Sequence, residues 1–262
     1  MSAMKRNLIC LPAVLLPLLL ITGCQPGTQS RYSPETEERI KLVENNLGDW
    51  VKGYGWADVD EKRPVTEKTL FQAASISKSL HGVGVLKLVQ DGKLDLYTDI
   101  NQYLKSWKFP YDSVSGGKPI TLSALLSHTA GLTIHGFPGY AQGDTLPSVQ
   151  QVVDGQKPAN TEAVRSFMEP GTRVVYSGGG TTITQQIVTD VTGRPYDEYM
   201  QKNVIDPMGM KSSSYRQPPA GTDTSLLATG YKADGTRVDG KFHIYPEQAA
   251  AGLWTNPTDL SG

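Results

Sequence analysis

Residues 71–80 constrain this chain more than any other stretch. An apolar approach ends there in small residues, and a serine then stands three positions before a lysine. If a helix begins near Ser75, this spacing places Ser75 and Lys78 on one face, one turn apart. Apolar residues recur as far as Val89, and Asp91 followed by Gly92 is typical of a helix end. The pattern predicts a helix that is apolar around most of its circumference and is therefore buried at the centre of the fold.

The same spacing suits nucleophilic catalysis. A serine hydroxyl is a poor nucleophile until a neighbouring base takes its proton, and a lysine held beside it can do so if its pKa is lowered. The N–H groups at a helix N-terminus would favour the negative charge that develops during acyl transfer. The alternative is that Ser75 only caps the helix and that Lys78 is a solvated residue of the first turn, because a short motif alone does not decide.

Composition bounds the classes of function. The chain has 262 residues, 38% of them hydrophobic and 19% charged, which is typical of globular protein in one large domain or two lobes. The formal charge of −1 would become −3 if Lys5 and Arg6 were removed with a leader, and there is no cluster of Lys and Arg. We therefore expect no nucleic-acid partner. The four histidines do not pair with carboxylates at ligand spacing, so we expect no metal and no other cofactor.

The N-terminus predicts export. Lys5 and Arg6 precede an apolar run over residues 8–21, which is too short to span a bilayer comfortably. The run ends in Leu-Ile-Thr-Gly-Cys24, which resembles a bacterial lipobox, and the resemblance implies cleavage before Cys24 and lipidation of its thiol. The alternative is a plain secretory signal with an incidental cysteine.

The predicted organisation is a lipoprotein signal peptide over residues 1–23, a polar tether over 24–34 and one domain over 35–262. The protein would be exported and anchored by acyl chains to the membrane of the bacterial cell envelope, facing the periplasm or the cell surface. Hydrophobic spacing and turn residues predict further elements. We expect helices at 34–47, 122–127 (with Thr121 as N-cap), 161–168 and 181–193, a long surface excursion at 133–160, and a hairpin over 229–245.

A second stretch, Tyr176-Ser177-Gly178, precedes the predicted helix 181–193. A glycine-rich turn before a helix can hold phosphate, but no lysine follows at the position that this function needs. The ordinary alternative for Tyr176 is a core tyrosine with its hydroxyl at the rim.

Together these stretches resemble the serine β-lactamase and penicillin-binding-protein superfamily, in its class C β-lactamase-like branch, which also contains esterases and D-amino-acid peptidases. Ser-x-x-Lys is a signature of that superfamily. The resemblance covers roughly residues 50–262. Its motifs occur in the family's order: Gly53-Tyr54-Gly55 through Pro64-Val65, Ser75 to Lys78, Ser127-His128-Thr129-Ala130-Gly131-Leu132, Tyr176-Ser177-Gly178, and Gly252-Leu253-Trp254 with Asp259-Leu260.

The resemblance implies an α/β fold of the α+β type, with a helical lobe beside an antiparallel sheet flanked by helices. It implies that Ser75 is the acylated nucleophile, that Lys78 shares its proton, and that Tyr176 is base and then acid, while Ser177 and Gly178 contact substrate. Tyrosine ordinarily has a pKa near 10, so it becomes a usable base only where a cation stabilises the phenolate. Lys78 would supply that charge. His128 is expected to be structural.

Two departures from the family pattern matter. The family has Asn two positions after the tyrosine, where it can meet the substrate's amide, and this chain has Gly178. The Lys/His-x-Gly motif of the strand that completes the oxyanion site is not found before Gly262. The first departure favours ester or small peptide substrates over β-lactams. From the second we expect an incomplete sheet, a truncated chain, and little or no turnover by this form.

The sequence therefore predicts an exported serine hydrolase that forms an acyl-enzyme on Ser75. Its substrates would be esters, amides or small peptides, with carboxylesterase, D-amino-acid peptidase or weak β-lactamase activity. The alternative is a non-catalytic envelope lipoprotein that binds peptidoglycan stem peptides in the inherited cleft.

Overall fold

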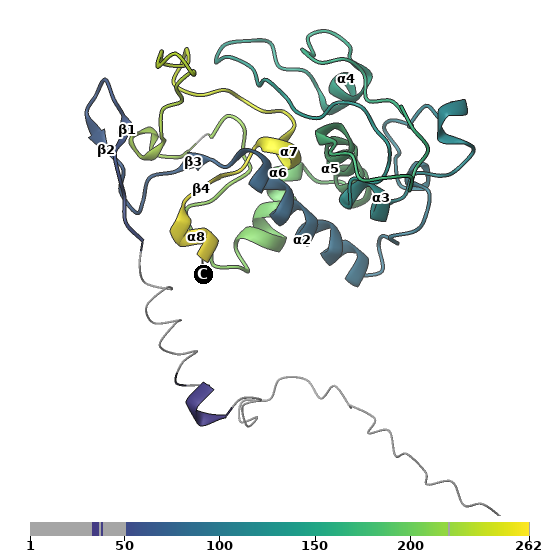
Figure 1. Cartoon of the computed structure of the whole chain (residues 1–262), viewed down its shortest axis with the longest axis horizontal. Helices are drawn as coiled ribbons and strands as arrows, with labels where there is room; N and C mark the ends of the chain where they lie inside the picture. The colour runs from purple at the N-terminus through teal and green to yellow at the C-terminus, as the bar shows by residue number, and fades with distance from the viewer. Residues whose placement is uncertain (1–32, 37, 39–50, 220, 262) are drawn as a thin grey trace, which may run out of the picture. The chain divides into compact units, whose positions relative to one another are not determined.

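Figure 1 shows the computed structural model of the chain, which describes residues 33–36, 38, 51–219 and 221–261. The chain divides into two compact units, Met1–Asp49 and Trp50–Gly262. In the first unit, residues 34–36 and 38 are helical, and Oγ of Ser33 accepts a hydrogen bond from the backbone N–H of Thr36 at 3.2 Å. The rest of the helix predicted over 34–47, the signal peptide and Cys24 lie outside the described residues.

The second unit contains two small antiparallel sheets. Strand β1 (Trp56–Asp58) pairs with β2 (Arg63–Pro64), and β3 (Phe71–Gln72) pairs with β4 (Trp254–Thr255). Figure 1 shows β3 leading into helix α2 (Ser77–Gln90), so the β3–β4 pair joins the start of that helix to a segment near residue 250. Helices beside small antiparallel sheets confirm the predicted fold class.

The helical part forms the main core. Side chains of α2 and of α5 (Gly178–Thr192) belong to one buried cluster, and the packing is close enough to need small residues. A Cβ added to Gly84 of α2 would lie 2.6 Å from Sδ of Met200, so an alanine there would require the buried Met200 side chain to shift. The remaining helices are α3 (Leu122–Leu126), α4 (Val149–Asp154), α6 (Tyr196–Met200), α7 (Gln248–Ala251) and α8 (Pro257–Ser261), with a π-helical turn η4 (Gln201–Ile205) and short 3-10 turns η1 (Ala74–Ile76), η2 (Ile100–Gln102), η3 (Ser113–Ser115) and η5 (Thr224–Leu226).

Helix ends agree with the local sequence signals. The side chain of Thr121 accepts from the N–H of Ala124 at 3.2 Å and caps α3 as predicted. Helix α2 ends at Gln90, and Gly92 adopts a left-handed φ of 68° just beyond it. Within the described ranges, no helix combines the length and the apolar character that crossing a bilayer requires.

Four local predictions are wrong. The helix is not buried around most of its circumference: Val83 and Leu86 of α2, and Ile76 in the turn before it, are about half exposed. Residues 161–168 form no helix, and Ser166 instead makes an isolated antiparallel bridge with Leu132. The excursion over 133–160 contains α4, whose Val152 and Val153 are fully buried. The segment 229–245 makes a turn, with an antiparallel bridge between Tyr231 and Arg237, but it contains no strand.

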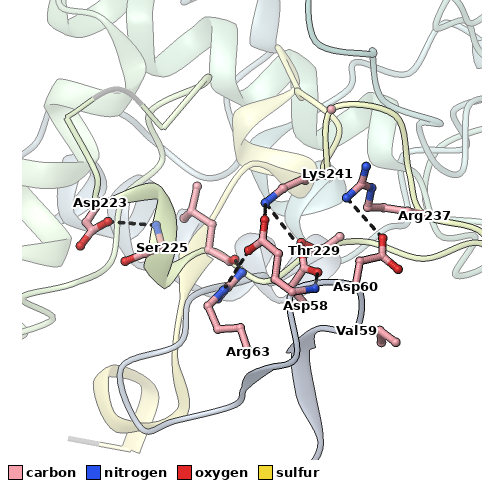
Figure 2. A network of polar contacts seen from close by, with 12 residues as sticks. Asp58, Val59, Asp60, Arg63, Asp223, Ser225, Thr229, Arg237 and Lys241 are labelled. Atoms are coloured by element: carbon pink, nitrogen blue, oxygen red, sulfur yellow. Dashed lines mark hydrogen bonds and ion pairs between the residues drawn. The ribbon is translucent and has the colours of Figure 1, made fainter.

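A polar network fastens the β1–β2 hairpin to residues 223–241 (Figure 2). Asp58 is fully buried and accepts from the hydroxyl of Thr229 at 2.6 Å and from the N–H of Glu61 at 2.9 Å. These hydrogen bonds lower the pKa of Asp58 to about 2, and the ammonium of Lys241, 3.6 Å away, adds to the effect. The guanidinium of Arg63 donates to the carbonyl of Leu227 at 2.7 Å.

The network makes a testable prediction for acid stability. We expect Asp58→Asn to lower the free energy of unfolding at pH 7 by about 2 kcal/mol, because buried charge-assisted hydrogen bonds are lost. Asp58 has a lowered pKa when folded, so its contribution is present above the unfolded pKa near 3.8 and is lost as the pH falls toward 2. Urea titrations at pH 7 and near pH 2 should show the difference between variant and wild type shrinking in acid.

The control is Asp60→Asn on the same hairpin. Asp60 pairs with Arg237 at 3.3 Å, but its side chain is 59% exposed, so its loss should change stability by less than about 1 kcal/mol. Equal losses in the two variants would contradict the importance assigned to Asp58.

Candidate active site

The chain presents Ser75 through a sharp local turn. Strand β3 ends at Gln72, the N–H of Ala73 donates to the carbonyl of Leu253 at 2.9 Å, and Ala74 adopts a φ of 46°. A positive φ is uncommon for a residue with a Cβ and is held here by the surrounding structure. Ser75 follows in the 3-10 turn η1, just before α2, and is exposed to solvent.

The structure brings Ser75, Lys78 and Tyr176 together. The hydroxyl of Tyr176 donates to Oγ of Ser75 at 2.8 Å, and Nζ of Lys78 donates to the same oxygen at 3.2 Å. Ser75 in η1 and Lys78 in the first turn of α2 are three residues apart, whereas Tyr176 lies 101 residues beyond Ser75 in the chain. The tyrosine side chain is 41% exposed, so the serine and the phenol meet at the surface.

A backbone carbonyl fixes the position of the lysine. Nζ of Lys78 donates to the carbonyl of Ala250 in α7 at 2.7 Å and lies 4.9 Å from the ring centroid of Tyr176. A cation over a tyrosine ring is attracted by the ring's negative face. The positive charge of Lys78 also acts on His128 and His81, whose pKa values are lowered first by burial and second by this lysine.

Tyr176 is positioned by the segment that opens α5. Ser177 caps the helix, with its Oγ accepting from the N–H of Gly180 at 2.9 Å. The N–H of Ser177 donates to Nδ1 of His128 at 3.3 Å, and the ring of His128 lies 4.5 Å from that of Tyr176. Because Nδ1 accepts there, it carries no proton, in agreement with the lowered pKa of His128.

Ser177 and Gly178, the two residues predicted to contact substrate, differ in the groups that they present. The side chain of Ser177 is buried, and besides capping α5 it donates to the carbonyl of Thr133 at 2.9 Å, so its hydroxyl faces the protein. Gly178 is the first residue of α5. A Cβ added to Gly178 would lie 3.0 Å from Cε2 of Phe137 and 3.3 Å from the carbonyl oxygen of His135.

Some residues around the site carry no sequence signal of their own. The carbonyl of Ala250 is part of the backbone, and any residue type would supply it. Phe137 and His135 lie in a long segment without helix or strand, which pattern reasoning predicted only as a surface excursion. Within the described parts of the chain, no group of three or more His, Cys, Asp or Glu side chains could hold a metal ion.

Fold and site together define a protein of the β-lactamase type. The β-lactamase family model matches residues 45–261, so the chain belongs to the β-lactamase family, and the predicted superfamily is confirmed. Protein flp of Staphylococcus aureus is 27% identical over 230 residues, which make up 84% of this chain and 43% of that protein. The chain therefore spans less than half of the length of this relative.

Solved structures agree with that assignment. D-amino acid amidase from Ochrobactrum anthropi SV3 is 26% identical with a TM-score of 0.62, and the match covers 79% of this chain and 56% of the amidase. EstCE1, a hydrolase with promiscuous acyltransferase activity, has a similar fold, with a TM-score of 0.64 at 20% identity. The match covers 86% of this chain and 70% of the EstCE1 chain.

A buried carboxyl group lies beside the helix that holds the lysine. Glu247 immediately precedes α7 and is fully buried, and within the described residues neither oxygen of its carboxyl group has a hydrogen-bond partner. Burial raises the pKa of Glu247 to about 7. Its charge in turn contributes to the raised pKa values of Tyr140 and Tyr245, after the larger effect of burial.

Glu247 makes stability depend on pH. Its folded pKa lies above the ordinary value of 4.5, so the stability present in acid is lost as the pH rises from 4.5 through about 7. At about 1.4 kcal/mol per pKa unit, the loss is on the order of 3 kcal/mol. We expect Glu247→Gln to remove this component from unfolding free energies measured by urea titration at several pH values. Glu162→Gln, a change at an exposed glutamate, is the control, and an unchanged pH dependence in Glu247→Gln would contradict the assignment.

Proposed function

We propose that this protein is a serine hydrolase that forms a covalent acyl-enzyme on Ser75. The observation that carries the proposal is the convergence of two groups on one hydroxyl. Oγ of Ser75 lies 2.8 Å from the hydroxyl of Tyr176 and 3.2 Å from Nζ of Lys78. A nucleophile within hydrogen-bond reach of a base, which is itself held by a third group, is the arrangement that acyl transfer needs.

The proposed acylation makes one bond, breaks one, and carries the proton of Ser75 to the leaving group by way of Tyr176. The phenol of Tyr176 donates to Oγ of Ser75 in the structure, so in the proposed step it first loses that proton to solvent. Oγ of Ser75 then attacks the carbonyl carbon of the substrate, and its proton passes to the oxygen of Tyr176. The ammonium of Lys78 beside the ring stabilises that phenolate. When the tetrahedral intermediate collapses, the bond to the leaving group breaks, and Tyr176 returns the proton to the leaving oxygen or nitrogen. Water then releases the acid from Ser75 by the reverse sequence.

The oxyanion would be held in part by the backbone N–H of Ser75, at the start of the turn that leads into α2. His128 supports this arrangement, because its Nδ1 accepts from the N–H of Ser177 and its ring lies 4.5 Å from that of Tyr176. It is therefore a positioning residue for Tyr176.

The substrates we propose are esters, amides or small peptides. Among proteins of similar fold, one is described as a D-amino acid amidase and one as a hydrolase with promiscuous acyltransferase activity. Gly178 lacks the side-chain amide that would meet an acylamino group, and an unpaired polar group on a substrate costs binding energy. This favours simple esters over β-lactams.

Covalent labelling tests the proposal without requiring turnover. We expect a fluorophosphonate probe to label the wild-type chain at Ser75, and Ser75→Ala to abolish labelling. Lys78→Ala and Tyr176→Phe should slow labelling by about 100-fold or more, because they remove general acid–base assistance. The measurement is labelling rate by intact mass spectrometry, with peptide mapping of the modified residue.

Ser79→Ala is the matched control, since Ser79 is an exposed serine on the same helix beside Lys78. It should react at the wild-type rate. A wild-type chain that labels no faster than Ser75→Ala would rule out the catalytic role. Saturable binding of a muropeptide that survives Ser75→Ala would instead support a non-catalytic peptidoglycan-binding lipoprotein.

For the cellular location, we propose export and lipid anchoring in the bacterial cell envelope through Cys24. The support is the sequence alone: a basic start, an apolar run and Leu-Ile-Thr-Gly before Cys24. Peptidoglycan stem peptides would be accessible to an enzyme at that location, and we propose them as one natural class of substrate.

Expression in a bacterial host with an alkyne-tagged fatty acid tests the anchor. The wild type should incorporate the label and fractionate with membranes. Cys24→Ala should lose both properties, because it removes the thiol that would carry lipid and stable anchoring needs two or more acyl chains. Cys10→Ala, which changes the leader cysteine only, should behave like the wild type. Labelling that persists in Cys24→Ala would exclude Cys24 as the lipidated residue.

A further inference from the structure

The position two residues after Tyr176 is closed by an aromatic ring. Gly178 carries no side chain, and a Cβ placed there would meet Cε2 of Phe137 at 3.0 Å and its Cδ2 at 3.5 Å. Carbon atoms in ordinary contact lie about 3.5–4.0 Å apart, so the Phe137 ring fills the space into which a side chain at 178 would extend. An aromatic edge therefore stands where the family pattern has a polar amide.

The ring is held in place by the segment that carries it. The carbonyl of Thr133 accepts from the hydroxyl of Ser177 at 2.9 Å, and the carbonyl of Ile134 accepts from the N–H of Gly179 at 3.0 Å. Nδ1 of His135 donates to the carbonyl of Tyr176. Three successive residues of the segment thus bind residues 176–179, which fixes Phe137 relative to the catalytic phenol.

Accessible apolar surface lies on and beside the segment that carries Phe137. Phe137 is partly exposed, and the side chain of Phe167 is 40% exposed, with its ring 6.5 Å from that of His135 in an edge-on arrangement. The polar Nδ1 of His135 is occupied by the carbonyl of Tyr176. A trans peptide chain spans at most about 3.6 Å per residue, so Gly178 lies within about 8 Å of the Cα of Tyr176.

We propose that Phe137, whose ring covers the buried Gly178, forms an apolar subsite for the acyl group of the substrate, so that esters of aromatic or medium-chain acids acylate Ser75 faster than acetate esters. This inference rests on the proposed function and names its substrate class. An acyl group that carries an amide would find no side-chain partner at position 178 and would leave polar atoms unpaired against the ring.

The test compares esters that differ only in the acyl group. p-Nitrophenyl acetate, hexanoate and phenylacetate share one leaving group, and the rate of Ser75 acylation by each is measured on the full chain by nitrophenol release and intact mass. We expect hexanoate and phenylacetate to react faster than acetate. Phe137→Ala should reduce that preference by about 10-fold, because several carbon atoms lose their contact, whereas Phe137→Leu should keep most of it.

Tyr97→Ala is the control, because its side chain is 75% exposed and its backbone N–H is the group bound to Asp95. It should leave the preference unchanged. An unchanged preference in Phe137→Ala, with acetate acylation intact, would overturn the subsite while leaving the serine hydrolase standing. Absence of Ser75 acylation by every ester would instead overturn the proposed function and the subsite with it.

A double variant replaces the apolar ring with a polar amide. Gly178→Asn combined with Phe137→Ala supplies an amide and removes the ring that would clash with it. We expect it to accelerate acylation by p-nitrophenyl phenylacetylglycinate, an ester with an amide in its acyl group, relative to phenylacetate. A relative rate equal to that of Phe137→Ala alone would show that position 178 does not face the acyl group. Circular dichroism verifies that each variant is folded.

Discussion

The site depends on one ammonium group and the two oxygens that receive it. Lys78 donates to Oγ of Ser75 within its own turn and to the carbonyl of Ala250, 172 residues away in sequence. The neighbouring Ser77 strengthens the same junction, since its hydroxyl accepts from the N–H of Leu253 at 3.0 Å and its carbonyl from the hydroxyl of Tyr215. The start of α2 is therefore bound on several sides before any substrate arrives, which is the preorganisation that electrostatic catalysis requires.

The glycines that open α5 serve packing. Gly178, Gly179 and Gly180 lie beneath the segment 133–139 and beside α3. A Cβ on Gly179 would come within 2.7 Å of Cγ2 of Val164, and one on Gly180 within 3.2 Å of Cδ2 of Leu125. The buried start of the helix leaves no room for side chains there. This contact explains a glycine run that, in sequence, also resembles a phosphate-binding turn, and it holds Tyr176 at the edge of the packed region.

Sequence reasoning was most accurate where the cause is local. The Thr121 cap and the end of α2 near Gly92 follow from short-range chemistry, and the family follows from motifs in a fixed order. It failed where tertiary contacts decide. Ile76 was predicted to be buried but is about half exposed. Residues 161–168 were predicted to form a helix, but Ser166 instead makes an antiparallel bridge with Leu132. The proximity of Tyr176 to Ser75 was an implication of the resemblance, whereas Phe137 could not be found, because no local pattern ties it to Gly178.

The proposed catalytic residues and the proposed acyl subsite lie in parts of the chain that are constrained to different degrees by the core. Ser75 lies in the turn η1 just before α2, Lys78 in the first turn of α2, and Tyr176 just before the buried α5, so replacing their supports would disturb the core. Phe137 lies in a segment with neither helix nor strand, and the hydrogen bonds that hold this segment involve Thr133, Ile134 and His135 but not the Phe137 side chain. Substitutions at Phe137 can therefore change the proposed acyl subsite without preventing the chain from folding. In evolution, this division would let paralogues with the same arrangement of Ser75, Lys78 and Tyr176 diverge in the acyl groups that they accept.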